Sequence, residues 1–234
     1  MEQSSTSALL QGTVLDLASD VVSALRSGDH VRAGGTLAAG GPGDGVARAA
    51  VRVLGADLLL PTTLLGLEPG PGRLTVFQEA VAAHQPRPDA APAVAWSHWA
   101  MTRALHRLGQ TPNGPLTGED AEPDAGWLDD AGWQYLTHQL AVLAPLALPG
   151  EENAVMRAAR RRPVDVARGF VRAVRRRDWQ QAAGAGRWLT LLDGVPATLG
   201  LEAGLDFVRL MGGGDPRVAL QLEAARLMPA GVLL

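Results

Sequence analysis

Residues 157–177 read RAARRRPVDVARGFVRAVRRR and carry nine arginines against a single acid, Asp165. Pro163 suits the first position of a helix, because its missing amide proton would have no intrahelical acceptor there. The apolar residues that follow recur at spacings of three and four, as they do on one face of a helix: Val164, Ala167, Phe170, Val171 and Val174. The stretch therefore predicts an amphipathic helix that begins at Pro163 and has arginines beside its apolar face.

The arginines of this stretch predict a binding surface. From Pro163 onward the helix would be about 22 Å long at 1.5 Å per residue, so its arginines form a stripe rather than a spot. We call residues 157–177 the arginine stripe. Guanidinium groups pair with carboxylates and phosphates. The candidate partner- or phosphate-binding residues are Arg157, Arg160, Arg161, Arg168, Arg172, Arg175 and Arg176.

A second stretch, residues 119–130, has the charge to neutralise the stripe. It holds six carboxylates and no basic residue: Glu119, Asp120, Glu122, Asp124, Asp129 and Asp130. These groups could meet the arginines within the fold or across a dimer interface. The alternative is that the stripe faces outward and binds another molecule. The net charge of the whole chain is −3, which argues against a dedicated nucleic-acid-binding protein, because such proteins are usually basic.

The composition limits the chemistry. With 234 residues, the chain can bury a sizeable core as one large domain or two small ones. There is no cysteine, which excludes disulfides, thiolate metal sites and cysteine nucleophiles. All 21 basic residues are arginine and isoleucine is absent, a bias typical of a high-GC bacterium. The abundance of arginine is thus partly a codon effect.

The fold class predicted is all-α, either a helical bundle or a short array of helical hairpins. Strand-like alternation is nearly absent, and glycine and proline separate segments of helix length. Aligning Asp29, Asp178 and Asp215 gives a weak self-similarity, with the last two 37 residues apart. Each aspartate would cap a helix that follows a helix and a tight turn. Chance alignment of alanine- and valine-rich helices explains the similarity equally well.

The connectors predict three parts. Residues 1–85 form an N-terminal helical lobe, in which residues 1–11 are frayed and the first helix starts near Thr13. Residues 86–126 hold a tryptophan- and histidine-bearing helix between a proline-rich and an acidic connector. Residues 127–234 form a C-terminal helical lobe that contains the arginine stripe.

Aromatic and histidine side chains concentrate in the middle third of the chain. The candidates for lining a pocket are Trp96, His98, Trp99, His106, Trp133 and His138. Tryptophan supplies a large buried area with one polar group, which suits a pocket wall as well as a core anchor, and core packing is the more usual role. The histidine spacings match no common zinc site, and neither a nucleophile signature nor a phosphate-binding loop is present. No metal and no cofactor is expected.

The N-terminus predicts a cytoplasmic, soluble protein. The first basic residue is Arg26, so the charged n-region of a secretory signal is missing. The longest apolar runs are interrupted by Pro61 and Pro145 and fall short of the ~20 residues that a membrane span needs.

Three functional hypotheses follow from these features. The first is a non-enzymatic scaffold or adaptor module that binds a protein partner, or a second subunit in a homodimer, through the arginine stripe. The second is a DNA- or RNA-binding protein that uses the same stripe. The third is a small-molecule binder or an enzyme whose site lies in the middle third. The absence of catalytic motifs favours the first hypothesis over the third.

Overall fold

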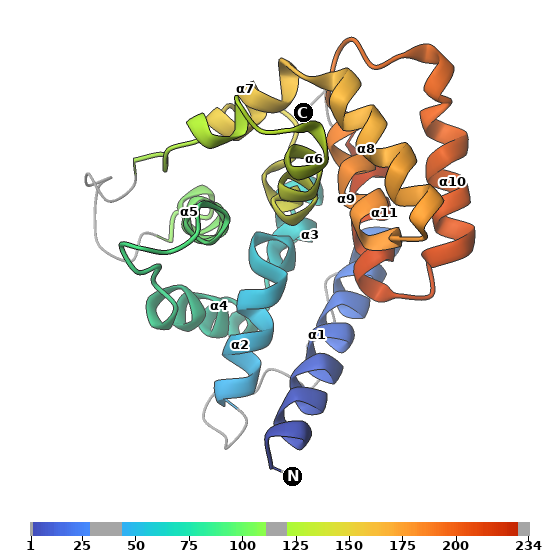
Figure 1. Cartoon of the computed structure of the whole chain (residues 1–234). Helices are drawn as coiled ribbons and strands as arrows, with labels where there is room; N and C mark the ends of the chain where they lie inside the picture. The colour runs from blue at the N-terminus through green and yellow to red at the C-terminus, as the bar shows by residue number, and fades with distance from the viewer. Residues whose placement is uncertain (1, 29–43, 111–120, 229–234) are drawn as a thin grey trace. The chain divides into compact units, whose positions relative to one another are not determined.

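The computed structural model describes residues 2–28, 44–110 and 121–228, and every element in these ranges is helical (Figure 1). The all-α prediction is therefore confirmed. Contacts divide the chain into two compact units, Met1–Ala121 and Glu122–Leu234. Each unit buries its own set of apolar side chains.

The first unit consists of α1 (Glu2–Ser27), α2 (Asp44–Leu54), η1 (Gly55–Leu59), α3 (Leu60–Leu65), α4 (Pro71–Ala83) and α5 (Pro92–Arg107). Helix α1 packs against α2, α3 and the 3-10 turn η1. Helix α4 packs between α2 and α5, and α5 also contacts η1. The leucine-rich segment at η1 is buried, because α1, α2, α3 and α5 all contact it.

Helix α1 begins at Glu2, so the prediction of frayed residues 1–11 and a start near Thr13 is wrong. The buried face of α1 includes Leu17, Val21 and Leu25, as the apolar spacing indicated. Once these residues have formed a helix against the core, each further turn adds hydrogen bonds at little cost, so the helix extends toward the N-terminus.

Part of α1, Thr6–Ser27, is long and apolar enough to cross a membrane by length and composition alone. It has 22 residues and a mean hydropathy of 1.3, and 39% of its most apolar window is buried within the structure. Core helices of soluble proteins and signal sequences meet the same criteria. Polar residues interrupt the segment throughout, so it contains no long uninterrupted apolar run and differs from the sequence-based prediction.

The second unit consists of η3 (Gly126–Leu128), α6 (Trp133–Val142), η4 (Ala144–Leu146), α7 (Ala154–Arg160), α8 (Pro163–Arg176), α9 (Trp179–Leu189), η5 (Ala197–Leu199), α10 (Leu201–Gly212) and α11 (Pro216–Leu227). Helix α9 is its centre and packs against α6, α8, α10 and α11 (Figure 1). In Figure 1, α8 passes in front of α9, and α10 stands at the right-hand edge of the picture.

The sequence of α9 explains its central position, because small residues let its neighbours approach closely. A β-carbon at Gly184 would lie 2.9 Å from the carbonyl oxygen of Ala141 in α6. Next to these small residues lies Trp188, which is fully buried and donates its indole N–H to the carbonyl of Leu140 at 2.6 Å. The glycines and alanines of α9 let neighbouring helices pack close to its backbone. Trp188 adds a large buried apolar area and a hydrogen bond to α6.

Helix α8 starts at Pro163, as predicted. The buried face of α8 is rotated about the helix axis relative to the predicted face. Val164, which was predicted to lie on the apolar face, is 45% exposed, whereas Val166 and Ala173 are buried. The cause lies at Gly169, where an added β-carbon would lie 2.1 Å from Oγ1 of Thr137 in α6. Contact with α6 at this glycine, as well as with α9, decides which side of α8 is covered.

Two of the three aligned aspartates cap helices as predicted. Asp178 accepts from the Gln181 N–H at 3.1 Å at the start of α9, and Asp215 accepts from the Arg217 N–H at 2.9 Å at the start of α11. The third, Asp29, lies outside the described residues. The helical repeat itself stays a prediction.

Candidate functional site

The first half of the arginine stripe is paired with the protein's own carboxylates. The pairs are Arg157 with Glu122 at 3.1 Å, Arg160 with Glu152, Arg161 with Asp129, and Arg168 with Asp165 at 3.3 Å. Exposed pairs of this kind stabilise a fold by at most about 1 kcal/mol each. They still occupy these guanidinium groups, which makes this half a poorer site for a partner.

Arg162 has a structural role. Its Nε and Nη2 donate to the carboxylate of Asp165 at 2.9 and 2.7 Å, and its Nη1 donates to the carbonyl oxygens of Ala131 at 2.6 Å and Leu128 at 3.2 Å. These bonds tie the segment before α6 to the start of α8. They thereby help to set the position of Trp133, the first residue of α6.

The second half of the stripe is different. We call Arg172, Arg175, Arg176 and Arg177 the arginine end. All four side chains are exposed, and within the described part of the chain none of them forms an ion pair. The guanidinium carbon of Arg172 lies 5.7 Å from the centre of the Trp133 ring, which is cation–π distance. The arginine end is therefore available to a partner.

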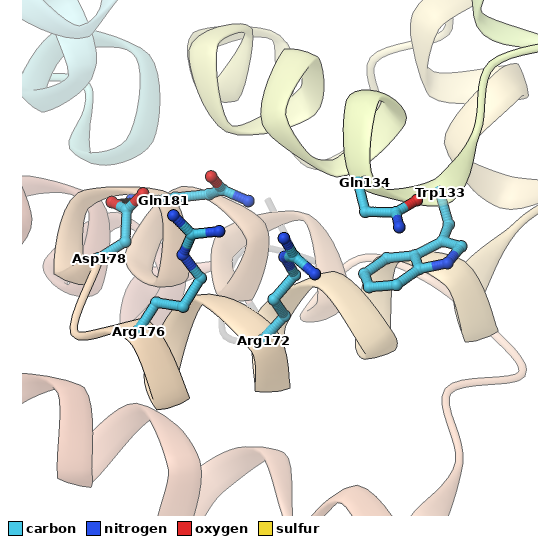
Figure 2. Close-up of a pocket in the computed structure, with 6 residues that line it drawn as sticks. All are labelled: Trp133, Gln134, Arg172, Arg176, Asp178 and Gln181. Carbon is cyan, nitrogen blue, oxygen red and sulfur yellow. Dashed lines mark hydrogen bonds between the residues drawn. The ribbon is translucent and has the colours of Figure 1, made fainter.

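A pocket of about 210 Å³ lies beside the arginine end, lined by Trp133, Gln134, Arg172, Arg176, Asp178 and Gln181. Its walls come from the start of α6, the last turns of α8 and the start of α9. Figure 2 shows Trp133 at one end and Asp178 at the other, with the two guanidinium groups between them. The Asp178 carboxylate caps α9, so it already accepts the N–H of Gln181.

The pocket has the chemistry of a small anion site. Arg172 and Arg176 are four residues apart on α8, so they are neighbours on its surface. The starts of α6 and α9 add partial positive charge, and no side chain caps α6. Pockets for drug-sized molecules span about 300–1,000 Å³, so this smaller space suits a single carboxylate or phosphate group.

The six predicted pocket residues of the middle third are divided between the two units. Trp96, His98, Trp99 and His106 lie on α5 of the first unit, whereas Trp133 and His138 lie on α6 of the second. Trp96 is fully buried and meets Trp99 edge to face at 5.2 Å, which is core packing. Trp133 instead contacts Arg172 and so lies beside the arginine end.

His98 is the most perturbed histidine of the described chain. Burial, and next the charge of Arg52, lower its pKa below the ordinary value of 6.5, so the imidazole is neutral at neutral pH. Arg52 donates to the carbonyl of Val94 at 3.2 Å, which anchors it beside α5. Within residues 2–28, 44–110 and 121–228, no group of three histidine, aspartate or glutamate side chains could hold a metal ion.

Sequence reasoning named Trp133, Arg172 and Arg176 but placed them in two separate candidate sites. It identified Asp178 only as a helix cap, and it missed Gln134 and Gln181 because an amide side chain on a helix carries no signal. The sequence matches no protein-family model, and no similar curated protein or solved structure was found.

Proposed function

We propose that this protein is a non-enzymatic helical interaction module that binds an anionic surface of a partner protein through the arginine end of α8. The observation that carries the proposal is the contrast within the arginine stripe. Arg157, Arg160, Arg161 and Arg168 have carboxylate partners in the same chain, and the arginine end has none in the described residues. A cytoplasmic location is part of the same proposal.

Helix stability alone does not account for the arginine end. Cations in the last turn of a helix interact favourably with its dipole, which explains Arg175 and Arg176. Arg172 lies one turn earlier, where the effect of the dipole is weaker. Arg177 lies beyond the helix in a left-handed conformation that disfavours arginine. Binding accounts for all four residues together.

The pocket suggests how a carboxylate would be bound. Trp133 lies against the guanidinium of Arg172 and limits its motion, so less conformational freedom is lost on binding. Arg176 offers a second fork of donors on the next turn, and two forks can hold one carboxylate with several charge-assisted hydrogen bonds. An aspartate or glutamate of the partner protein fits this arrangement.

Nucleic acid is the second candidate, favoured by the same free guanidinium groups. Four arginines that neutralise four phosphates would give a log–log salt slope of roughly −4. Against it stands the net charge of −3, because nucleic-acid-binding proteins are usually basic. The third hypothesis, a small-molecule binder or an enzyme whose site lies in the middle third of the chain, would show as a change in tryptophan fluorescence during a ligand screen.

The test compares two double variants that remove the same charge. Arg172→Gln/Arg176→Gln changes the arginine end, and Arg157→Gln/Arg161→Gln changes the paired half. Poly-L-glutamate and a DNA duplex serve as probes, and affinity is measured by fluorescence anisotropy at low and moderate salt. We expect the first variant to bind poly-L-glutamate at least about tenfold more weakly, because even one lost hydrogen bond to a charged group costs about 1.5–3 kcal/mol. The second should change affinity less than about twofold, because Arg157 and Arg161 are already paired with carboxylates of the same chain.

Equal losses in the two variants would mean that the probe responds to net charge alone, and the proposal would be rejected. Tighter binding of the DNA duplex, with the steep salt dependence given above, would select the nucleic-acid hypothesis instead. Circular dichroism of each variant checks that the helices remain folded.

A further inference from the structure

Helix α10 exposes a row of large apolar side chains. Phe207 is 45% exposed, Leu210 81% and Met211 51%. Their spacing of three and four residues puts them on one side of the helix. The other side is covered, since Val208 is buried and Gly212 lies against Trp179. A contiguous exposed apolar patch in a folded protein commonly marks a surface for another molecule.

The apolar row borders the arginine end. The Trp179 ring meets the Phe207 ring at 6.0 Å in an edge-to-face contact, and a β-carbon at Gly212 would lie 2.5 Å from the Trp179 β-carbon. Trp179 follows Arg177 by two residues, so this tryptophan joins the two surfaces. Farther along, α8 and α10 also touch, because a β-carbon at Gly204 would lie 2.9 Å from the Phe170 ring.

Resting on the function proposed above, we infer that the partner segment is an acidic amphipathic helix. Its apolar side covers Phe207, Leu210 and Met211, and its carboxylates face Arg175, Arg176 and Arg177. An amphipathic helix fits because side chains at this spacing on α10 form a ridge that another helix can pack against. An acidic one fits because a neutral or basic segment would leave the arginines unpaired or repelled.

The charges on α10 itself do not change this assignment. Asp206 lies among the exposed residues, and its carboxylate accepts from Nη1 of Arg209 at 2.6 Å. The other acid of the helix, Glu202, lies in its first turn, at the end away from Met211. The free charges beside the apolar row are therefore the four cations of the arginine end and the single carboxylate of Asp178, so the surface is positive on balance.

Two features favour a partner helix over other occupants. Helix α11 ends next to Thr190, where the Met228 sulfur is 4.0 Å from Oγ1 of that residue, at the opposite end of α9 from Trp179. The described chain thus leads away from the apolar row. An anionic membrane would bring phosphates against the carboxylates of Asp178 and Asp206, whereas a helix can place its own charges to avoid them.

The experiment is a selection from a library of displayed random peptides of about 20 residues, long enough for five helical turns. The full-length protein is the target, and Leu210→Ser is the counter-target. Leu210 is 81% exposed, so the substitution leaves the core intact. Val164→Ser serves as the matched control, because Val164 is an exposed apolar residue at the other end of α8 in the same unit.

We expect the enriched peptides to combine aspartate or glutamate with large apolar residues at spacings of three and four. Synthetic versions should bind at least about tenfold more weakly to Leu210→Ser and to Arg175→Gln/Arg176→Gln, since a few central residues dominate most interfaces. Their affinity for Val164→Ser should equal their affinity for the native protein.

Enrichment of neutral or basic peptides, or no enrichment at all, overturns the inference, as does equal binding to Leu210→Ser. If Arg172→Gln/Arg176→Gln nevertheless weakens poly-L-glutamate binding, the proposed function stands without the apolar row.

Light scattering that shows a dimer in the native protein and a monomer in Leu210→Ser would assign the row to a second copy. Binding to phosphatidylserine vesicles that Leu210→Ser abolishes, with no peptide enriched, would assign it to lipid. Either result also overturns the inference.

Discussion

Arg177 has an unusual backbone for an arginine. Its φ is 59°, and among the described residues it is the one non-glycine residue with positive φ. The left-handed conformation costs an L-residue with a side chain about 1–2 kcal/mol, which is why glycine is the usual residue directly after a helix. An arginine that retains this strain at the end of α8 is consistent with a role in binding.

Replacing Arg177 by glycine should therefore separate stability from binding. We expect Arg177→Gly to raise the free energy of unfolding by about 0.5–1 kcal/mol, since the strain disappears while the glycine loses somewhat more chain entropy. Affinity for poly-L-glutamate should fall. Urea unfolding and fluorescence anisotropy measure the two effects.

Arg177→Gln is the control for this experiment, because it removes the charge and keeps the strain. It should lose the same affinity without any gain in stability. A glycine variant that is less stable than the native protein would contradict the account of strain, and one that binds normally would remove Arg177 from the site.

At the scale of single elements, the start of α11 should make stability depend on pH. The side chain of Arg217 donates to the Asp215 carboxylate at 3.1 and 2.7 Å, and this hydrogen bonding lowers the pKa of Asp215 below its ordinary value of 3.8. Because the folded state binds the proton less readily, the carboxylate stabilises the fold above pH ~3.8, and this contribution is lost as the pH falls through the folded pKa.

Asp215→Asn tests this effect, because asparagine also caps helices but carries no charge. At neutral pH we expect it to lower the free energy of unfolding by about 0.5–1 kcal/mol, since the pair is partly exposed to solvent. The difference from the native protein should shrink as the pH falls below about 4. Urea unfolding over a pH series measures it, and a difference that is constant with pH would refute the assignment.

The packing of α9 shows what an element's own sequence leaves open. The alanines and glycines of this helix predict a helix with a small-residue surface, but they do not say which neighbours approach. Gly184 faces α6, and Gly186 faces Leu205 of α10. These assignments depend on the order in which four helices surround α9, which no local pattern encodes.

At the scale of the whole molecule, the division into two compact units predicts that a part of the chain can fold by itself. Residues 122–234 form one compact unit around α9, with fully buried Leu136, Leu140 and Trp188. About 100 residues with such a core are enough for an autonomous domain. We expect the fragment 122–234 to be helical by circular dichroism and to melt cooperatively.

The fragment should also bind poly-L-glutamate like the full-length protein, because the arginine end and its pocket lie within it. A fragment that is unfolded by circular dichroism would show that the second unit depends on the first. A folded fragment that fails to bind would place part of the binding surface elsewhere in the chain.

Features that depend on a few neighbouring residues followed from the amino-acid sequence alone. These are the all-helical class, the start of α8 at Pro163, and the caps at Asp178 and Asp215, because each arises from interactions within one turn of the chain. The division of the arginine stripe and the pairing of Arg172 with Trp133 required the tertiary structure. Glu122 and Arg157 are 35 residues apart, and Asp129 and Arg161 are 32 apart, so only the packing of whole helices brings these charges together.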